Sequence, residues 1–289
     1  MIHKAVLKEE ILHFIQLKKG EWYLDATLGS GLVSQSMLVL GANVIAIDCD
    51  EISLKLATDQ IQKQNYPGVF VPIEGNFRDV KEILNKIEKP MLSGVLFDLG
   101  ISSDQLEDPQ KGLSFLSDGK LDMRIDSALN VTAEDLVNGL GYKELVKMFI
   151  NYGEVIYPQL VAKAITNYRK NKLIQSTTEL ADIIRRAYGS KWHRTIHPAT
   201  QVFMALRIAV NDELNNLRIA LTDVIPLIKT GGRLLVISFH SLEDRIVKDI
   251  FKGNRNLKVI NKKPILASLR EITSNSRARL AKLRVFEKI

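Results

Sequence analysis

The sequence predicts an α/β protein built on a mostly parallel sheet, with a helical subdomain inserted into it. Two observations lead to this fold class. Short β-branched runs alternate with amphipathic stretches through roughly the first hundred residues, which is the pattern of parallel strands joined by crossover helices. About 130 residues, largely of helical character, then precede a further buried strand, whereas a minimal crossover needs only about 10 to 12.

The first part of the chain predicts four strands. They read WYLDATL (22–28), NVIAID (43–48), GVFVPIEG (68–75) and GVLFDLG (94–100). The three gaps between them have helical spacing, and we place helices from the glycines after residue 28 to about Leu40, from Glu51 to Gln64 and from Arg78 to Glu88. Each gap therefore completes a strand-helix-strand unit.

The second part predicts helices and then one more strand. Helical spacing is found in AEDLVNGL (133–140), YKELVKMFI (142–150), QLVAKAITNYRK (159–170) and TELADIIRRAY (178–188). A long amphipathic stretch from about Thr200 to Ile228 is expected to end at Gly231 and Gly232, before the buried strand RLLVISF (233–239). We therefore expect a core at 1–104, an inserted helical substrate-recognition domain at 105–199 and the rest of the core, with a basic tail, at 200–289.

Composition excludes several classes of protein. The chain is 46% hydrophobic and 25% charged, and no apolar run approaches the roughly 18 residues that span a bilayer, so no membrane association is expected. The start, MIHKAVLKEE, is acidic in part and lacks the long apolar run of a secretory signal. The single Cys49 allows no intrachain disulfide. These features predict a cytoplasmic protein.

The positive charge is concentrated at the end of the chain. Residues 253–289 hold 10 Lys and Arg against 2 Asp and Glu, so the other 252 residues, with 30 basic against 31 acidic, carry a net −1. Basic residues such as Arg277 and Arg279 alternate with apolar ones, so the segment can pack and still present charge to phosphates. A solvated, soluble face would have the same composition, but we favour contact with nucleic acid.

The loop DATLGSG lies between a buried strand and a helix, and it predicts a ligand site. Gly29 and Gly31 allow a ligand to approach backbone amides at the start of the helix. Asp48 ends the next strand 17 residues after Gly31, near the spacing of roughly 20 at which an acidic residue binds a ribose in such folds. Together they indicate a nucleoside ligand.

Two nucleoside cofactors fit this loop. A nicotinamide dinucleotide would call for a third glycine where the chain has Ser34, and a dehydrogenase would explain neither the basic tail nor the segment SFHSLEDR. Asp25 suits a ligand with an amino group and a sulfonium cation better than a pyrophosphate, although it could simply cap the turn. Phe77, after the third strand, is placed to flank an adenine or to fill the core. We therefore favour S-adenosylmethionine.

Polar residues after the fourth and fifth strands predict the acceptor site. The carboxyl edge of such a sheet binds substrates, and Asp98 is our candidate there for orienting an exocyclic amine, with Gln105 fixing a neighbouring polar group. His240, Ser241 and Asp244 follow the fifth strand, where they line the pocket or tie its walls together. The pair His193 and His197 has metal-ligand spacing, but Pro198 interrupts the element and no carboxylate completes a set, so no metal is expected.

Ordered motifs along nearly the whole chain resemble the RsmH (MraW) family of 16S rRNA cytosine methyltransferases. They are HKAVLKEE, DATLGSG, DLGISSDQL, KGLSFLSDGKLDMRID, HPAT, ALRIAVNDEL, SFHSLEDRIVK and SRARLAKLR. The resemblance implies a Rossmann-like class I methyltransferase core with an inserted helical subdomain. It also implies methylation of the exocyclic N4 amine of a decoding-centre cytosine in 16S rRNA of the small ribosomal subunit.

The resemblance also implies which residues contact the donor and the substrate, because the family's motifs can be matched to this chain position by position. Donor contacts carry over to Gly31, Leu32, Val33, Asp48, Phe77, Asp98 and Gln105, in addition to Asp25 and Gly29 from the loop itself. The same motifs and the basic tail offer candidates for contact with the substrate, namely Asp122, Arg124, His197, His240, Ser241, Arg277 and Arg279. Oligomeric state stays open, with a dimer as one option.

One departure from the family concerns the donor loop. The family reads Gly-Gly-His where this chain has Gly31-Leu32-Val33, and a leucine at positive φ would be strained by about 1 kcal/mol or more. The leading hypothesis is an active rRNA methyltransferase. The alternative is a non-catalytic rRNA-binding assembly factor that has lost the donor.

Overall fold

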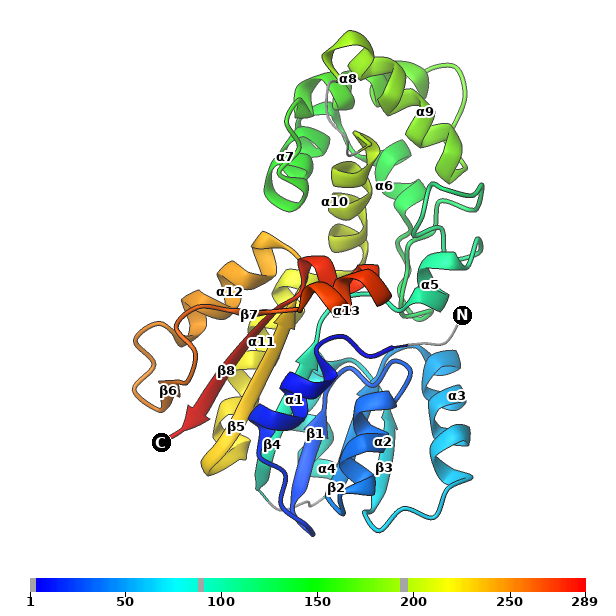
Figure 1. Ribbon diagram of the computed structural model, residues 1–289. Helices are drawn as coiled ribbons and strands as arrows, with labels where there is room; N and C mark the ends of the chain where they lie inside the picture. The colour runs from blue at the N-terminus through cyan, green and yellow to red at the C-terminus, as the bar shows by residue number, and fades with distance from the viewer. Residues whose placement is uncertain (1–3, 88–90, 193–196) are drawn as a thin grey trace. The chain divides into compact units, whose positions relative to one another are not determined.

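The computed structural model describes residues 4–87, 91–192 and 197–289, which form two compact units (Figure 1). The sheet unit comprises Met1–Gly100 and Leu214–Ile289, and the helical unit comprises Ile101–Glu213. Among the described residues, no helix has the length and apolar character needed to span a bilayer.

An eight-stranded sheet forms the centre of the sheet unit, in the order β3-β2-β1-β4-β5-β8-β6, with β7 also paired to β8. β1 to β5 are parallel, and β8 is antiparallel to β5. The strand order reverses between β1 and β4, and ligands of such sheets bind beyond the carboxyl ends of the strands at this point. The bounds are β1 Trp22–Asp25, β2 Asn43–Asp48, β3 Phe70–Glu74, β4 Leu92–Asp98, β5 Ile228–Ser238, β6 Leu257–Val259, β7 Ile265–Leu266 and β8 Lys282–Lys288.

All five strands predicted from the sequence are present, whereas the three after residue 239 were not predicted. β8 lies beside β5, with Leu283 and Val285 fully buried in the core. Its basic residues alternate with apolar ones because successive side chains of a strand point to opposite faces. The basic tail is therefore in part a strand of the sheet.

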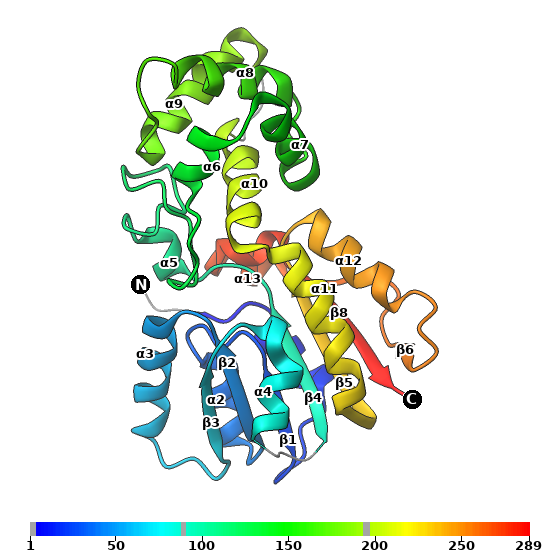
Figure 2. The same ribbon diagram turned by 180° about the vertical axis from the view of Figure 1, so that it is seen from behind.

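Helices cover both faces of this sheet (Figures 1 and 2). One core cluster lies with α1 Lys8–Ile15, α2 Leu32–Val39 and α3 Glu51–Gln62, and the other with α4 Val80–Lys86, α11 Glu213–Val224 and α12 Ser241–Phe251. Residues of one strand alternate between the two clusters: Val95 and Phe97 belong to one, and Leu96 to the other. Two further elements, α13 Leu269–Ser274 and η4 Ser276–Leu280, precede β8.

The helical unit has its own apolar core, which includes the fully buried Leu145, Phe149, Val161, Ile184 and Leu206. Its helices are α5 Ser103–Glu107, α6 Ala133–Gly139, α7 Tyr142–Gly153, α8 Pro158–Tyr168, α9 Thr177–Tyr188 and α10 Ala199–Asn211, with the short η2 Gly189–Lys191. Those from α6 to α9 match the four helical stretches seen in the sequence. α10 packs on α7, so this unit extends beyond the expected bounds of 105 and 199.

The amphipathic stretch predicted from about Thr200 to Ile228 forms two helices, and its predicted end at Gly231 and Gly232 was wrong. Asp212 adopts a left-handed conformation (φ 49°) and separates α10 from α11, and η3 Ile225–Leu227 follows α11. Gly231 and Gly232 do not end a helix, because β5 already begins at Ile228. The predicted helix from Arg78 is also shorter, since Phe77–Asp79 form the 3-10 helix η1 and α4 ends at Lys86, while Glu88 lies outside the described residues.

Candidate functional site

The loop after β1 is organised around the buried carboxylate of Asp25. Its Oδ2 accepts a 2.7 Å hydrogen bond from the Ser34 hydroxyl, and its Oδ1 accepts one of 3.3 Å from the Thr27 amide. Burial raises the pKa of Asp25 to about 6, although the hydrogen bonds from Ser34 and Thr27 act against this. Ser34, at the position where a dinucleotide loop would have glycine, is thus a partner of Asp25. Asp25 fulfils the turn-capping role that the sequence left open.

Asp48 ties the glycine loop to the end of β2. Its Oδ2 accepts the Gly29 amide at 2.8 Å, and its Oδ1 accepts the Asp50 amide at 2.9 Å. Gly29 and Gly31 both adopt positive φ, 50° and 72°. A Cβ at Gly31 would lie 3.2 Å from Ala57 and Ile61 side chains, whereas one at Gly29 would meet nothing within 4 Å. The open side of the loop is therefore at Gly29.

The strain expected at Leu32 is absent, because of where α2 begins. Leu32 is the first residue of α2 and is not at positive φ; that conformation is taken by Gly31, the N-cap. Val33 is 6% exposed and packs in the core with Met37 and Leu38. The two aliphatic residues therefore form an ordinary first helical turn, and the expected strain at Leu32 is absent.

Asp98 ends β4 at the same edge of the sheet. Its backbone amide donates a 2.7 Å hydrogen bond to the Thr27 hydroxyl. Within the part of the chain that the structure describes, its Oδ1 is buried and has no hydrogen-bond partner. Burial raises the pKa of this carboxyl to about 7, with Arg277 lowering it and Asp25 and Glu243 raising it. Such a buried acceptor calls for a donor that the protein itself does not supply.

Two of the residues around Asp98 come from distant parts of the chain. Arg277 belongs to η4, and Glu243 to α12, yet both act on its charge. From the sequence, Arg277 is notable only for its positive charge, and neither Glu243 nor Thr27 is predicted to belong to the site. The only signal for these two was their position inside the motifs SFHSLEDR and DATLGSG.

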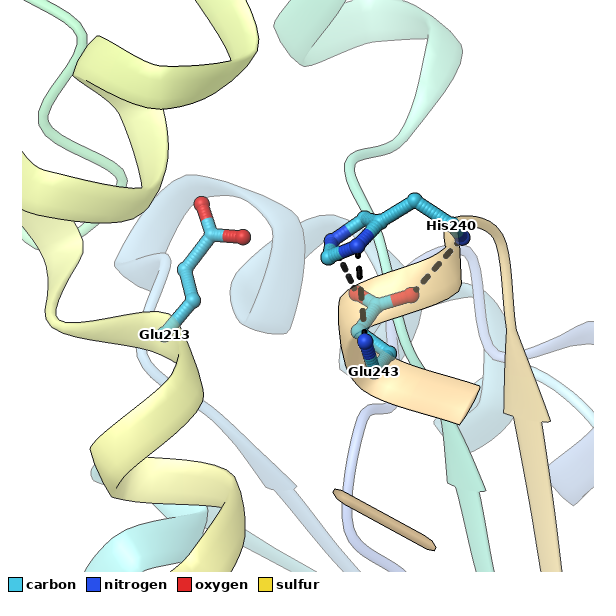
Figure 3. Close-up of side chains that lie close together, drawn as sticks. All are labelled: Glu213, His240 and Glu243. Carbon is cyan, nitrogen blue, oxygen red and sulfur yellow. Dashed lines mark hydrogen bonds and ion pairs between the residues drawn. The ribbon is translucent and has the colours of Figure 1, made fainter. Parts of the chain in front are cut away.

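His240 and Glu243 form a capping box at the start of α12 (Figure 3). Glu243 accepts the backbone amides of Phe239 and His240 at 2.8 and 3.2 Å, and its Oε1 lies 3.1 Å from His240 Nε2. Ser241 is exposed as the first residue of the helix. Glu213, also labelled in Figure 3, is paired with Arg207 at 2.8 Å within the helical unit. His240 thus serves the helix end, which was one of the two roles considered for it.

Asp244 and Arg284 form a buried ion pair between α12 and β8. Arg284 Nε lies 2.5 Å from Asp244 Oδ1, and their side chains are only 10% and 8% exposed. Lys248 Nζ approaches the same carboxylate at 3.4 Å. Arg284 is therefore committed to the interior and cannot present its charge to phosphate, unlike the exposed Arg279.

The other predicted donor residues lie in different settings. Phe77, in η1, packs edge-on against Phe97 with ring centroids 5.8 Å apart. Gln105 belongs to the helical unit, where its Oε1 accepts the Ser102 amide at 2.9 Å as part of the capping box of α5. Gln105 therefore has a structural role of its own, and its donor contact stays a prediction.

Three substrate candidates lie in the helical unit. Asp122 and Arg124 pair with each other, with Nε to Oδ1 at 2.7 Å and Nη2 to Oδ2 at 2.8 Å, and Arg124 Nη1 also donates to the Leu129 carbonyl. His197 packs near Phe115 at 4.9 Å and accepts the Ala199 amide on Nδ1. Burial lowers the pKa of His197, and the charge of Arg185 adds to this. His193 lies outside the described residues, so the absence of a metal stays a prediction.

The chain is similar to proteins of known class. A family model described as the MraW methylase family matches residues 1–289. Ribosomal RNA small subunit methyltransferase H of Carboxydothermus hydrogenoformans is 42% identical, with 99% of this chain and 98% of the relative covered.

Solved structures resemble the chain more distantly. An rRNA methylase of Streptococcus thermophilus has 9% identity and a TM-score of 0.45 over 100% of this chain and 99% of that one. TrmN of Thermus thermophilus has 13% identity and a TM-score of 0.43, with 98% of this chain and 48% of that one covered. The family model covers the whole length of the sequence, and the relative is 42% identical over almost all of it. This chain belongs to the MraW methylase family.

Proposed function

We propose that this chain transfers the methyl group of S-adenosylmethionine to the exocyclic N4 amine of a cytosine in 16S rRNA of the small ribosomal subunit. As a member of the MraW methylase family it is a methyltransferase. The 42% identical relative is named for the RNA of the small ribosomal subunit, which supports the same class of substrate here. The more specific assignment, to the N4 amine of a decoding-centre cytosine, is supported by the resemblance of the sequence motifs to the RsmH (MraW) family.

The loop after β1 fits the donor. Gly29 has room beside its Cα, and the first turn of α2, including Leu32 and Val33, offers backbone amides near Gly31. We assign contact with the ribose hydroxyls to Asp48, at the end of β2, and contact with one face of the adenine to Phe77. When bound, S-adenosylmethionine supplies a methyl group attached to a positively charged sulfur, which makes the methyl carbon electrophilic.

The observation that carries the proposal is Asp98 Oδ1, which is buried and has no hydrogen-bond partner among the described residues. The amine of cytosine is a weak nucleophile because its lone pair is conjugated with the ring. Asp98 accepts a hydrogen bond from that amine, which orients the lone pair toward the methyl group. As the nitrogen bonds to the methyl carbon, the bond from that carbon to sulfur would break and the sulfur would leave as neutral S-adenosylhomocysteine. The nitrogen then becomes more acidic, and Asp98 would take the proton that it releases.

RNA contacts are proposed for both units. In the sheet unit, Arg279 is exposed and Arg277 half-buried, and both are suited to phosphates. In the helical unit, the candidates are Asp122, Arg124 and His197. A cytosine in folded RNA must leave its stack to reach Asp98, which costs a few kcal/mol. A ribosomal substrate implies a compartment with ribosomes, which we expect to be the cytoplasm.

The alternative of a non-catalytic assembly factor loses its motivation. It rested on Leu32 and Val33, but neither is strained and Val33 is a core residue. The strain that would have argued against donor binding is therefore absent.

One experiment tests the proposal. The protein is incubated with methyl-labelled S-adenosylmethionine and small subunits that lack the modification, and label is mapped in the rRNA. We expect label on one cytosine N4, and its loss in Asp98→Asn while calorimetry shows that this variant still binds the donor. Absence of label with the native chain, together with absence of donor binding, would refute the proposal.

A further inference from the structure

Phe239 lies at the same edge of the sheet as Asp98, on the neighbouring strand. It comes directly after the last residue of β5. In the pairing of β4 with β5, Asp98 lies opposite Ile237, and the Leu99 amide donates a 3.0 Å hydrogen bond to the Ile237 carbonyl. Paired strands are only about 4.8 Å apart. The same register places Phe239 beside Gly100, two residues beyond Asp98.

The side chains of Asp98 and Phe239 also belong to the same face of the sheet. Successive side chains of a strand alternate between the two faces. Leu96, two residues before Asp98, and Ile237, two residues before Phe239, are both buried in the core cluster that lies with α1, α2 and α3. Phe239 itself packs against this cluster. The candidate acceptor residue and the aromatic ring are therefore neighbours on one face, at adjacent strand ends.

Gly100 and Glu243 hold Phe239 in place. Gly100 has a φ of 117°, and a Cβ added there would lie 3.1 Å from Phe239 Cδ2 and 3.4 Å from Cε2, so the ring packs closely on the glycine backbone. The Phe239 amide donates a 2.8 Å hydrogen bond to Glu243 Oε2, within the capping box of α12. The side chain is only half-buried, whereas Ile237 on the same strand is fully buried. Part of a well-anchored aromatic ring is thus left open beside Asp98.

The order of the strands sets the side from which an acceptor can approach. Asp48, Asp25 and Asp98 end β2, β1 and β4, which are successive neighbours in the sheet, and β5 lies on the other side of β4. The donor proposed for Asp48 and the loop after β1 occupies the β2 and β1 side. Methyl transfer needs nitrogen, methyl carbon and sulfur in line, so the acceptor has to lie beyond the methyl group, toward β5. A base whose amine reaches Asp98 from there meets Phe239.

We propose that the ring of Phe239 stacks on the target cytosine while Asp98 accepts a hydrogen bond from its exocyclic amine. The inference rests on the proposed function, because it names the residue that holds the base in that same site. A cytosine that has left its stack exposes both faces of its ring, and an aromatic side chain replaces one of the lost neighbours. Such stacking tolerates any base. Phe239 therefore supplies affinity and orients the ring plane, and Asp98 supplies the choice of an amine.

The kinetic test replaces the aromatic face and keeps an apolar side chain. In Phe239→Leu we expect kcat/KM for small ribosomal subunits to fall by about tenfold or more, as when other base-stacking aromatic residues are truncated. Calorimetry should show native affinity for S-adenosylmethionine. Phe239→Tyr keeps the ring and should retain most of the native kcat/KM. Phe70→Leu is the matched control, since Phe70 is half-buried against the same core cluster but begins β3 at the opposite edge of the sheet.

A second measurement follows base binding without catalysis. The fluorescence of Phe239→Trp is titrated with cytidine in the presence of S-adenosylhomocysteine, and the native chain, which has Trp22 and Trp192, gives the background. We expect saturable quenching in the variant alone. Such quenching without methylation of small subunits by the native chain would support the stacking and count against the proposed function alone. Native kcat/KM in Phe239→Leu, or quenching in Phe239→Trp no greater than the background, would overturn the inference.

Discussion

The Asp98 amide donates a 2.7 Å hydrogen bond to the Thr27 hydroxyl, which joins the end of β4 to the loop after β1. The same loop residue donates its backbone amide to Asp25. Thr27 therefore links the candidate acceptor residue to the candidate donor loop by one hydrogen bond and is itself held to Asp25 by a second. The Thr27 side chain thus adds to the backbone pairing of β1 with β4 in fixing the two segments together.

Thr27→Val should therefore impair both stability and catalysis. Valine has the same shape but leaves the Asp98 amide without an acceptor, at a cost of about 1–3 kcal/mol. We expect a lower melting temperature and a kcat at least about tenfold lower, since small displacements of reacting groups are expensive. Thr27→Ser keeps the hydroxyl and should stay near native in both. A Thr27→Val enzyme with native kcat would contradict the linking role.

Methyl transfer should depend on the ionisation of Asp98. Because its pKa is raised to about 7, the fraction of ionised carboxylate falls steeply below neutrality. We expect kcat to rise with pH through a midpoint near this value and then level off. Asp98→Asn should lose about 10²-fold or more in kcat, the usual contribution of a positioned proton acceptor. A native profile without a midpoint near neutrality would exclude Asp98 as the ionising group.

Asp98 should also make the protein less stable as pH rises. Its folded-state pKa of about 7 lies above the ordinary value of 3.8, so the folded state binds its proton more tightly than the unfolded state. Stability is then fully present at acidic pH and is lost as pH rises through about 7. Asp98→Asn should raise the melting temperature by about 2–4 °C at about pH 8 and by little at about pH 4. Asp59→Asn, an exposed change in α3, is the control and should show no such dependence.

The two glycines of the donor loop should respond differently to alanine. Both have positive φ, which costs alanine about 1 kcal/mol or more. At Gly31 the added Cβ also lies 3.2 Å from Ala57 and Ile61, so Gly31→Ala should lower the melting temperature more. At Gly29 an added Cβ would meet no atom of the described residues within 4 Å, its chain neighbours aside, so Gly29→Ala should mainly weaken donor binding, by about tenfold or more in calorimetry. If Gly31→Ala weakened donor binding more than Gly29→Ala did, the donor would have to bind away from Gly29.

The sequence predicted the five parallel strands and the helical insertion because their apolar patterns are local. It could not predict that Arg277 and Glu243 act on Asp98, since that depends on how segments more than a hundred residues apart come together. It also misjudged Leu32. Whether that residue or Gly31 takes the left-handed conformation depends on where α2 begins, and element boundaries are the least predictable feature of a helix.

Arg284 gives the sharpest contrast within the basic tail, because composition treats it like its neighbours while its side chain is buried against Asp244. Arg284→Met leaves the Asp244 carboxylate buried, with Lys248 Nζ at 3.4 Å as its remaining ion-pair partner among the described residues, and breaking a buried pair in this way costs about 3–5 kcal/mol. We expect a large fall in the denaturant midpoint. The double variant Arg284→Met with Asp244→Leu removes both charges and should recover much of the loss, since an apolar pair needs no desolvation. Arg279→Gln, in contrast, should leave the denaturant midpoint unchanged. It should make the slope of log binding constant against log salt concentration shallower, by the amount expected for the loss of about one phosphate contact. If Arg284→Met instead weakened RNA binding without loss of stability, the side chain would have to face the RNA and not α12.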